Sequence, residues 1–257
     1  MASVVPRSAV IARLRAAGCV FAEDEARLLV EAAAGPAELD AMIERRVGGE
    51  PLEQVLGWAE FLGLRIVLEP GVFVPRRRTE LLARHATALT GRGAVVVDLC
   101  CGSGAVGAAV YAAVPGVEVF ASDVEPAAVR CARGNVTGTV FEGDLYEPLP
   151  DSLRGRVNVL VANAPYVPSG AVALMPPEAR LHEPLVALDG GADGLDVLRR
   201  TVAGAPAWLA PGGYLLFETS TGQAPVATAM VAAAGLAPEI VTDDDLGATV
   251  VVGRLEP

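Results

Sequence analysis

From residue 94 to the C-terminus, short valine-rich apolar runs alternate with longer segments whose apolar residues have helical spacing. The short runs predict strands, and strands that alternate with helices predict a mostly parallel, doubly wound sheet. Because a short loop separates the last two runs, we expect them to form an antiparallel edge. The sequence therefore predicts an α/β fold with seven strands, at 94–99, 117–123, 139–144, 157–163, 212–219, 237–243 and 248–255.

The first part of the chain has a different pattern. Apolar residues at helical spacing predict three helices, which end near Gly18, Gly35 and Gly48. A hairpin is expected at 61–75, with the Glu-Pro-Gly sequence at 69–71 as its turn. The predicted division of the chain is a helical domain (1–48), a linker with a short hairpin (49–75) and an α/β domain (76–257).

The composition favours a folded protein with a sizeable core and excludes several classes of enzyme. Hydrophobic residues make up 52% of the 257 residues and charged residues 20%. All 20 basic residues are arginine. The chain therefore lacks the lysine that pyridoxal-phosphate enzymes and P-loop NTPases require. The two histidines, His85 and His182, lie far apart, so we expect neither a metal site nor a Ser-His triad.

Charge and hydropathy bear on the partners of the chain and on its location. The net charge of −11 disfavours the basic face that bulk nucleic acid requires, so no stable nucleic-acid binding is expected. No apolar run approaches the roughly 18 residues of a membrane span, and the N-terminus lacks the apolar stretch of a secretion signal. The four cysteines form no CxxC pair. We therefore expect reduced thiols, no membrane association and a cytoplasmic location.

A glycine-rich turn follows the first strand of the expected sheet. Gly102, Gly104 and Gly107 form a GxGxxG pattern between that strand and the next helix. Glycine lets the backbone turn tightly and approach a ligand, and a helix N-terminus offers free N–H groups. The pattern predicts an adenosine-type cofactor at the carboxyl ends of the strands. Both a nicotinamide dinucleotide and S-adenosylmethionine fit it.

Three acidic residues end successive strands of the expected sheet. Asp123 can accept hydrogen bonds from ribose hydroxyls. Asp98 can fix the loop or meet a cationic methionine group, whereas it would repel a pyrophosphate, so it favours S-adenosylmethionine. Asp144 suits an adenine amino group, with Leu145 as an apolar wall, and a turn or cap residue is its alternative role.

The fourth strand ends in Asn163-Ala164-Pro165-Tyr166, at the same edge of the sheet as the glycine turn. A planar NH2 group has a delocalised lone pair and is a weak nucleophile. The Asn163 side-chain oxygen and the Ala164 carbonyl could hold its two hydrogens, align it and favour positive charge on its nitrogen. Pro165 would fix the turn, and Tyr166 would pack on the planar group. An ordinary Asn-Pro-type turn is the alternative.

Six segments of the chain have sequences typical of one known family, at 49–64, 74–82, 98–107, 163–166, 177–200 and 217–223. Together they resemble the release-factor glutamine N(5)-methyltransferases. The resemblance spans nearly the whole chain. It implies a Rossmann-like S-adenosylmethionine methyltransferase fold with a small N-terminal helical domain that helps to dock a protein substrate.

The resemblance also implies a substrate and a set of binding residues. Residues 163–166 would hold a glutamine side chain, which in this family belongs to the Gly-Gly-Gln motif of translation release factors. The expected partner is therefore a peptide chain release factor. With the acids above, the residues predicted to bind S-adenosylmethionine are Asp98, Cys100, Cys101, Gly102, Ser103, Gly104, Asp123, Asp144, Leu145 and Asn163.

The chain departs from the family pattern at four places. Ala164 replaces a proline, Cys100-Cys101 replaces a Gly-Thr pair, and Arg77-Arg78 replaces a Pro-Glu-type pair. The tail at 245–253 lacks the usual Asp-Arg. Two alternatives to a protein-glutamine methyltransferase follow. One is a methyltransferase for another planar nitrogen, in a small-molecule amide or a nucleobase amine. The other is a protein that binds S-adenosylmethionine without transferring its methyl group.

Other polar residues have plainer interpretations. Glu218 closes the fifth strand, where it either faces the pocket or acts as a cap. His182 and Glu183 are expected to order the loop over the site. Arg199 and Arg200 are expected on a solvated helix face.

Overall fold

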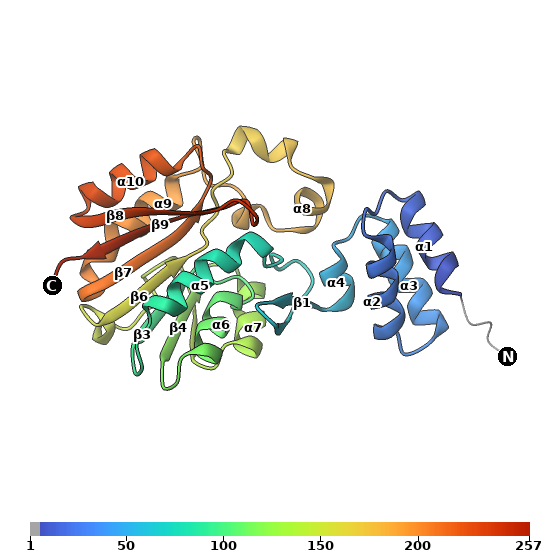
Figure 1. Cartoon of the computed structure of the whole chain (residues 1–257), viewed down its shortest axis with the longest axis horizontal. Helices are drawn as coiled ribbons and strands as arrows, with labels where there is room; N and C mark the ends of the chain where they lie inside the picture. Colours follow the sequence, from blue (N-terminus) through green and yellow to red (C-terminus); the bar gives the residue numbers. More distant parts are fainter. Residues whose placement is uncertain (1–5) are drawn as a thin grey trace.

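The computed structural model describes residues 6–257, so the first five residues of the predicted helical domain lie outside the described residues. A seven-stranded sheet in the order β5-β4-β3-β6-β7-β9-β8 forms the centre of the larger part of the molecule (Figure 1). The first five strands of this order are parallel, and β9 and β8 form an antiparallel edge. The predicted fold class is thus confirmed. The strands are β3 (Val95–Leu99), β4 (Glu118–Asp123), β5 (Thr139–Glu142), β6 (Val157–Ala162), β7 (Leu209–Thr219), β8 (Leu236–Asp243) and β9 (Ala248–Leu255).

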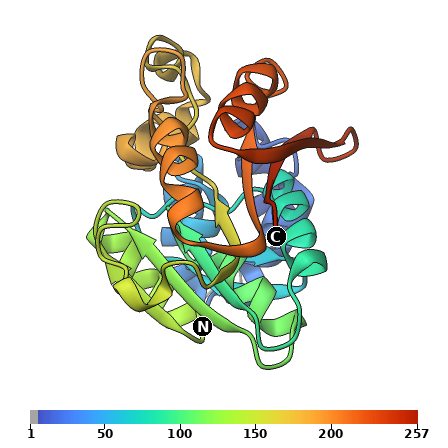
Figure 2. The same ribbon diagram turned by 90° about the vertical axis from the view of Figure 1, so that its left-hand side faces the viewer.

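Helices cover both faces of the sheet, as the end-on view in Figure 2 also shows. On β3, Val96 packs into one hydrophobic layer, while Val95 and Val97 pack into the other. A strand that is buried on both faces needs apolar residues throughout, which explains the unbroken valine runs. The first layer contains α5 (Glu80–Leu89), α6 (Ala105–Ala113) and α7 (Pro126–Asn135), and the second contains α9 (Asp196–Gly204) and α10 (Ala224–Ala233).

Four short helices at the N-terminal end form an apolar cluster of their own, at the right of Figure 1. Leu14, Leu29 and Ile43 are fully buried in it. Three of the helices correspond to those predicted from helical spacing, and the fourth lies in the segment expected to be a linker. They are α1 (Arg7–Ala16), α2 (Ala22–Ala32), α3 (Pro36–Val47) and α4 (Leu52–Leu56).

The short hairpin forms, but the prediction of its turn was wrong. Strand β1 (Trp58–Phe61) pairs with β2 (Leu64–Val67) through Leu62 and Gly63. These two residues have φ angles of 51° and 78°, and a two-residue turn with two positive φ angles matches the twist of a hairpin. The Glu-Pro-Gly sequence at 69–71 instead forms the next bend, because the first strand begins three residues earlier than predicted.

Phe61 anchors this hairpin in the hydrophobic core that α5 and α6 share with the sheet, where its side chain is fully buried. We expect Phe61→Ala to lower the free energy of unfolding by about 3–5 kcal/mol, because it leaves a cavity. The control is Phe21→Ala, which truncates a ring in a residue that is 69% exposed. That change should stay within about 0.5 kcal/mol. Urea denaturation measures both, and equal effects would contradict the placement of the hairpin.

Candidate active site

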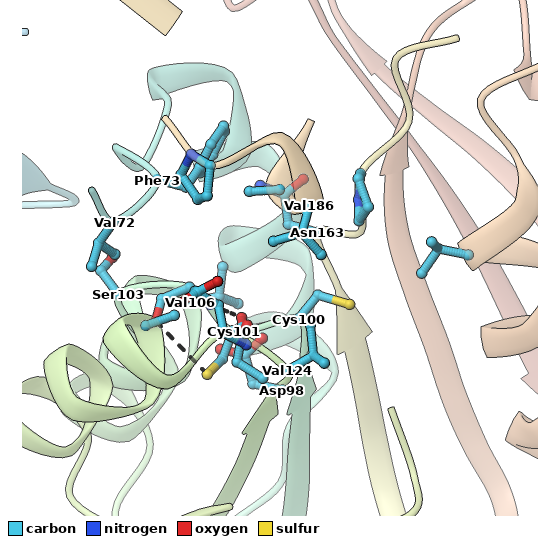
Figure 3. A pocket seen from close by; sticks show the side chains of 18 of the residues that line it. Val72, Phe73, Asp98, Cys100, Cys101, Ser103, Val106, Val124, Asn163 and Val186 are labelled. Atoms are coloured by element: carbon cyan, nitrogen blue, oxygen red, sulfur yellow. Dashed lines mark hydrogen bonds between the residues drawn. The ribbon is translucent and has the colours of Figure 1, made fainter. Parts of the chain in front are cut away.

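A cavity of about 250 Å³ opens at the carboxyl ends of β3, β4 and β6. In Figure 3, Asp98, Cys100 and Asn163 lie near the strand ends, and Phe73 and Val186 come from two other segments above them. All but one of the residues predicted to bind a cofactor line this cavity. These lining residues are Asp98, Cys100, Cys101, Gly102, Ser103, Asp123, Asp144, Leu145 and Asn163.

Gly104, the exception, does not line the cavity but lets the glycine loop pack closely against α7. It has a φ of +79°, and a Cβ atom there would lie 2.5 Å from Cγ2 of Val136. Gly107 allows a less extreme approach, because a Cβ there would lie 3.2 Å from Cγ1 of Val119 and 3.3 Å from Oδ2 of Asp98. These two glycines therefore let α6 and its loop pack tightly against β3 and the end of α7.

The carboxylates of the buried Asp98 and the half-buried Asp123 hold the glycine loop in place. Oδ2 of Asp98 accepts a hydrogen bond from the Gly107 N–H group at 2.9 Å. Oδ2 of Asp123 accepts one from the Gly102 N–H group at 2.8 Å. Burial raises the pKa of Asp98 to about 7 and also raises the pKa of Asp123. A cationic ligand would offset this loss of solvation.

Two residues that line the cavity, Arg200 and Asp144, make a contact that the sequence did not indicate. Arg200 is exposed, as expected for a solvated helix face, but it also donates a hydrogen bond to Asp144 at 2.6 Å and lines the cavity. Arg199 pairs with Asp193 and Asp196 on the surface. Among the described residues that line the cavity, Arg200 is the basic one. Four lining residues are acidic, namely Asp98, Asp123, Glu125 and Asp144.

A second cavity, of about 310 Å³, adjoins the first. The turn after β6 forms part of the wall between them, because Asn163 and Pro165 line both cavities, as do Phe73 and Ala187. Ala164 and Tyr166 line the second cavity alone. Its other walls come from the linker, from the segment just before α5 and from the chain that follows the turn, and they include Pro51, Glu53, Arg76, Arg78, Met175 and Glu178.

Contacts to the Tyr166 carbonyl hold the turn at 163–166, while two oxygen atoms of the turn remain available as hydrogen-bond acceptors. Nε2 of Gln223 donates a hydrogen bond to the Tyr166 carbonyl at 2.9 Å. The backbone at Gly194 packs so closely that a Cβ there would lie 2.2 Å from the same carbonyl oxygen. Among residues 6–257, no protein group donates a hydrogen bond to Oδ1 of Asn163 or to the carbonyl of Ala164. Both oxygens can therefore accept from a ligand.

Glu218, at the end of β7, is 1% exposed and lies behind the turn, outside the lining of both cavities. Its carboxylate accepts hydrogen bonds from Thr79 Oγ1 at 2.7 Å and from the Tyr166 hydroxyl at 2.7 Å. It also pairs with Nε of Arg78 at 2.9 Å. Thr79 was missed by the sequence reasoning. The only signal for it was its place inside the segment 74–82, which carries the family resemblance.

The chain between the turn and α9 covers the second cavity, and we call residues 168–188 the cover segment. It contains α8 (Pro177–His182). As expected, Glu183 orders this segment, since it accepts hydrogen bonds from the Val74 N–H group at 3.1 Å and from Arg76 at 2.5 Å. The buried Arg46 of α3 donates to Glu178 at 2.5 Å. The N-terminal helices are thus bonded directly to the cover.

The cysteines are free thiols. Burial raises the pKa of Cys100 and of Cys101 above the ordinary value, which keeps both thiols neutral.

Within residues 6–257, no group of three His, Cys, Asp or Glu side chains is placed to hold a metal ion. Across the same range, no helix has both the length and the apolar character that a membrane crossing needs.

Comparisons with known proteins show which family this chain resembles. The family model described as the methyltransferase small domain matches residues 63–178. The release factor glutamine methyltransferase of Geobacter sulfurreducens is 38% identical over 226 residues, which cover 85% of this chain and 78% of that enzyme. The 4-amino-L-phenylalanine/4-methylamino-L-phenylalanine methyltransferase of Streptomyces pristinaespiralis is 38% identical over 203 residues, or 75% of this chain and 69% of that enzyme.

A solved structure shows the same fold at lower identity. It is the T. thermophilus 16S rRNA N2 G1207 methyltransferase in complex with AdoMet and guanosine. The TM-score is 0.56 at 22% identity, and the match covers 77% of this chain and 50% of that one. The likeness supports the assignment of the sheet and its helices.

The raised pKa of Asp98 generates a stability prediction. Because the pKa of Asp98 in the folded protein, about 7, exceeds the ordinary value of 3.8, the stability linked to this group is lost as pH rises between the two values. We expect the free energy of unfolding of the wild type to fall, relative to Asp98→Asn, by about 1 kcal/mol per pH unit between pH 5 and 6.5. Denaturation of the ligand-free proteins measures the difference. If the free energies of unfolding of the wild type and of Asp98→Asn changed with pH in parallel, Asp98 would not have a raised pKa in the folded protein.

Proposed function

Since the chain belongs to the release factor glutamine methyltransferase family, we propose that it transfers a methyl group from S-adenosylmethionine to the side-chain amide nitrogen of a protein glutamine. The proposed substrate is a peptide chain release factor, methylated at the glutamine of its Gly-Gly-Gln motif. The observation that carries the proposal is the position of Asn163 in the wall between two cavities, beside the Ala164 carbonyl.

The first cavity suits S-adenosylmethionine better than a dinucleotide. Four acids and one arginine line it, and that arginine is already paired with Asp144. A pyrophosphate would meet excess negative charge there, whereas a sulfonium would be attracted. Asp123 would hold the ribose hydroxyls, Asp144 and Leu145 the adenine, and Asp98 with the loop 100–104 the methionine part. When bound, S-adenosylmethionine supplies a methyl group on a positively charged sulfur.

The second cavity would hold the acceptor amide. An amide nitrogen is a weak nucleophile, so most of the rate must come from positioning and from acceptors that favour positive charge on it. Oδ1 of Asn163 and the Ala164 carbonyl would each accept one of its two N–H groups. Pro165 would fix the turn and Tyr166 would pack against the amide plane. The alkylated amide is acidic enough to release a proton to water, so no strong base is needed.

The N-terminal helices are proposed to help dock the protein substrate. Supporting this, Pro51 and Glu53, next to and within α4, line the second cavity opposite the catalytic turn. Arg46 bonds α3 to the cover segment over the same cavity. A substrate loop that enters the cavity would therefore meet residues from both parts of the chain. We propose 1–48 as the docking domain, 49–75 as the linker and 76–257 as the catalytic domain.

A second candidate substrate is a small molecule with a planar amine and a carboxylate. One relative is named for 4-amino-L-phenylalanine, an amino acid with an aromatic amine. In this chain Arg78 lines the second cavity with a side chain that is 42% exposed. It bonds through Nε, and its terminal nitrogens have no protein acceptor among residues 6–257. Such a guanidinium can bind a carboxylate.

Mass spectrometry with deuterium-labelled S-adenosylmethionine tests the proposed function. Purified protein is incubated with the organism's own release factors and, separately, with a proteome extract and a small-molecule extract. We expect label on the glutamine of Gly-Gly-Gln. Label on another protein would keep the reaction and change the substrate, and label on an amino acid would favour the second candidate. Cofactor binding without label in any extract would contradict catalysis and leave a non-catalytic binding protein.

Asn163→Ala tests the role of the turn. Because it removes one of the two proposed acceptors, we expect the turnover rate to fall at least about 100-fold, while the folded fraction stays unchanged. The control is Asn158→Ala, since Asn158 lies at the opposite end of β6 and bonds to the Val95 N–H group. That variant should keep its turnover rate. Equal rates for Asn163→Ala and the wild type would rule out the proposed acceptor.

A further inference from the structure

The buried carboxylate of Glu218 is connected to both ends of the turn at 163–166. It is bonded directly to the Tyr166 hydroxyl and, through Thr79, to the side chain of Asn163. We propose that Thr79 and Glu218 are positioning residues that fix which way the Asn163 amide points. This inference rests on the proposed function, in which the Asn163 oxygen accepts a hydrogen bond from the substrate.

The direction of each hydrogen bond follows from the chemistry of the groups. A carboxylate has no hydrogen to donate, so the Thr79 hydroxyl must donate to Glu218, at 2.7 Å. Its proton is then committed, and Oγ1 can offer only lone pairs to Asn163. The neighbouring group of Asn163 must therefore be its NH2, at 3.4 Å. The NH2 end of the amide faces Thr79, which leaves Oδ1 for the substrate.

The pair between Arg78 and Glu218 supports this direction. Nε of Arg78 lies 2.9 Å from Glu218, so the carboxylate accepts from this group as well as from the two hydroxyls. The same Nε donates to the Tyr166 hydroxyl at 2.9 Å, which in turn donates to Glu218 at 2.7 Å. Burial, together with the charge of Glu218, raises the pKa of Tyr166, so its hydroxyl keeps the proton that it donates.

The network offers a physical reason why alanine is tolerated at position 164. A proline there would restrict the backbone through its ring. In this chain the residues on either side of Ala164-Pro165 are tied to one buried carboxylate, and Gln223 holds the Tyr166 carbonyl at 2.9 Å. Ala164 itself is 1% exposed, so packing also restricts it. The turn is therefore fixed by contacts from outside as well as by the ring of Pro165.

Nuclear magnetic resonance tests the orientation without any turnover. The chain has three asparagines and two glutamines, so five side-chain NH2 groups can be resolved and assigned. In Thr79→Val, which keeps the shape and removes the hydroxyl, we expect the Asn163 NH2 signals to shift and to exchange faster with water. Thr79→Ser should restore the wild-type signals. Unchanged Asn163 signals in Thr79→Val would overturn the proposal.

The matched control is Thr90→Val. Thr90 adjoins the opposite end of α5, and its hydroxyl is also buried, where it bonds to the Ala86 carbonyl at 2.7 Å. This variant should leave the Asn163 signals in place. If Thr79→Val does not fold, Glu218→Gln gives the same readout. Its amide can donate to Thr79 and reverse the direction of the bonds, so the Asn163 NH2 signals should again move, and their constancy would contradict the inference.

Steady-state kinetics provide a second readout with the substrate found in the labelling experiment. We expect Thr79→Val to lower kcat about 10- to 100-fold, the range for loss of a group that orients a reacting residue. Its affinity for S-adenosylmethionine should remain within about twofold of wild type, and Thr79→Ser should recover most of kcat. Equal kcat values in wild type and Thr79→Val would reject the positioning role. An inactive wild type would instead reject the proposed function, while the NMR readout still decides the inference.

Discussion

The buried carboxylate of Glu218 is the constraint on which the arrangement of the site depends. A charge that is 1% exposed must be compensated by donors, because an unpaired buried charge is strongly destabilising. The donors come from two separate segments, Arg78 and Thr79 before α5 and Tyr166 after β6. Hydrogen bonds to this one group therefore fix α5, β7 and the turn at 163–166 relative to one another. The position of the turn therefore depends on the hydrogen bonds that compensate the buried carboxylate as well as on packing.

The parallel sheet decides where the other polar groups gather. Because the carboxyl ends of parallel strands lie at one edge, Asp98 and Asp123 reach the same cavity from two neighbouring strands. Their hydrogen bonds to Gly107 and Gly102 hold the glycine loop, and their burial leaves the cavity suited to a positive charge. The structural role of these acids and their suitability for a sulfonium thus have the same physical cause.

The N-terminal helices and the cover segment are also joined by a buried charge. Arg46 is 8% exposed and bonds both to Glu25 of its own helical cluster and to Glu178 of the cover. Such a pair contributes modestly to stability but strongly disfavours separation, since breaking it leaves an uncompensated guanidinium. The second cavity is thereby enclosed by two parts of the chain that are far apart in sequence. Residues from both parts line this cavity.

The sequence by itself determined the features that local patterns encode. Valine runs identified the seven strands, and helical spacing identified the helices between them. The glycine turn, the acids and residues 163–166 were located because each lies at the end of a strand or directly after it. The hairpin turn was misplaced, because Glu-Pro-Gly is a strong turn signal and the start of β1 at Trp58 is a weak strand signal. Only the tertiary structure decided that Thr79 meets Glu218, 139 residues away, and that Arg200 pairs with Asp144. Periodicity reports which side of an element is buried, whereas the partner of a polar side chain depends on how distant elements pack.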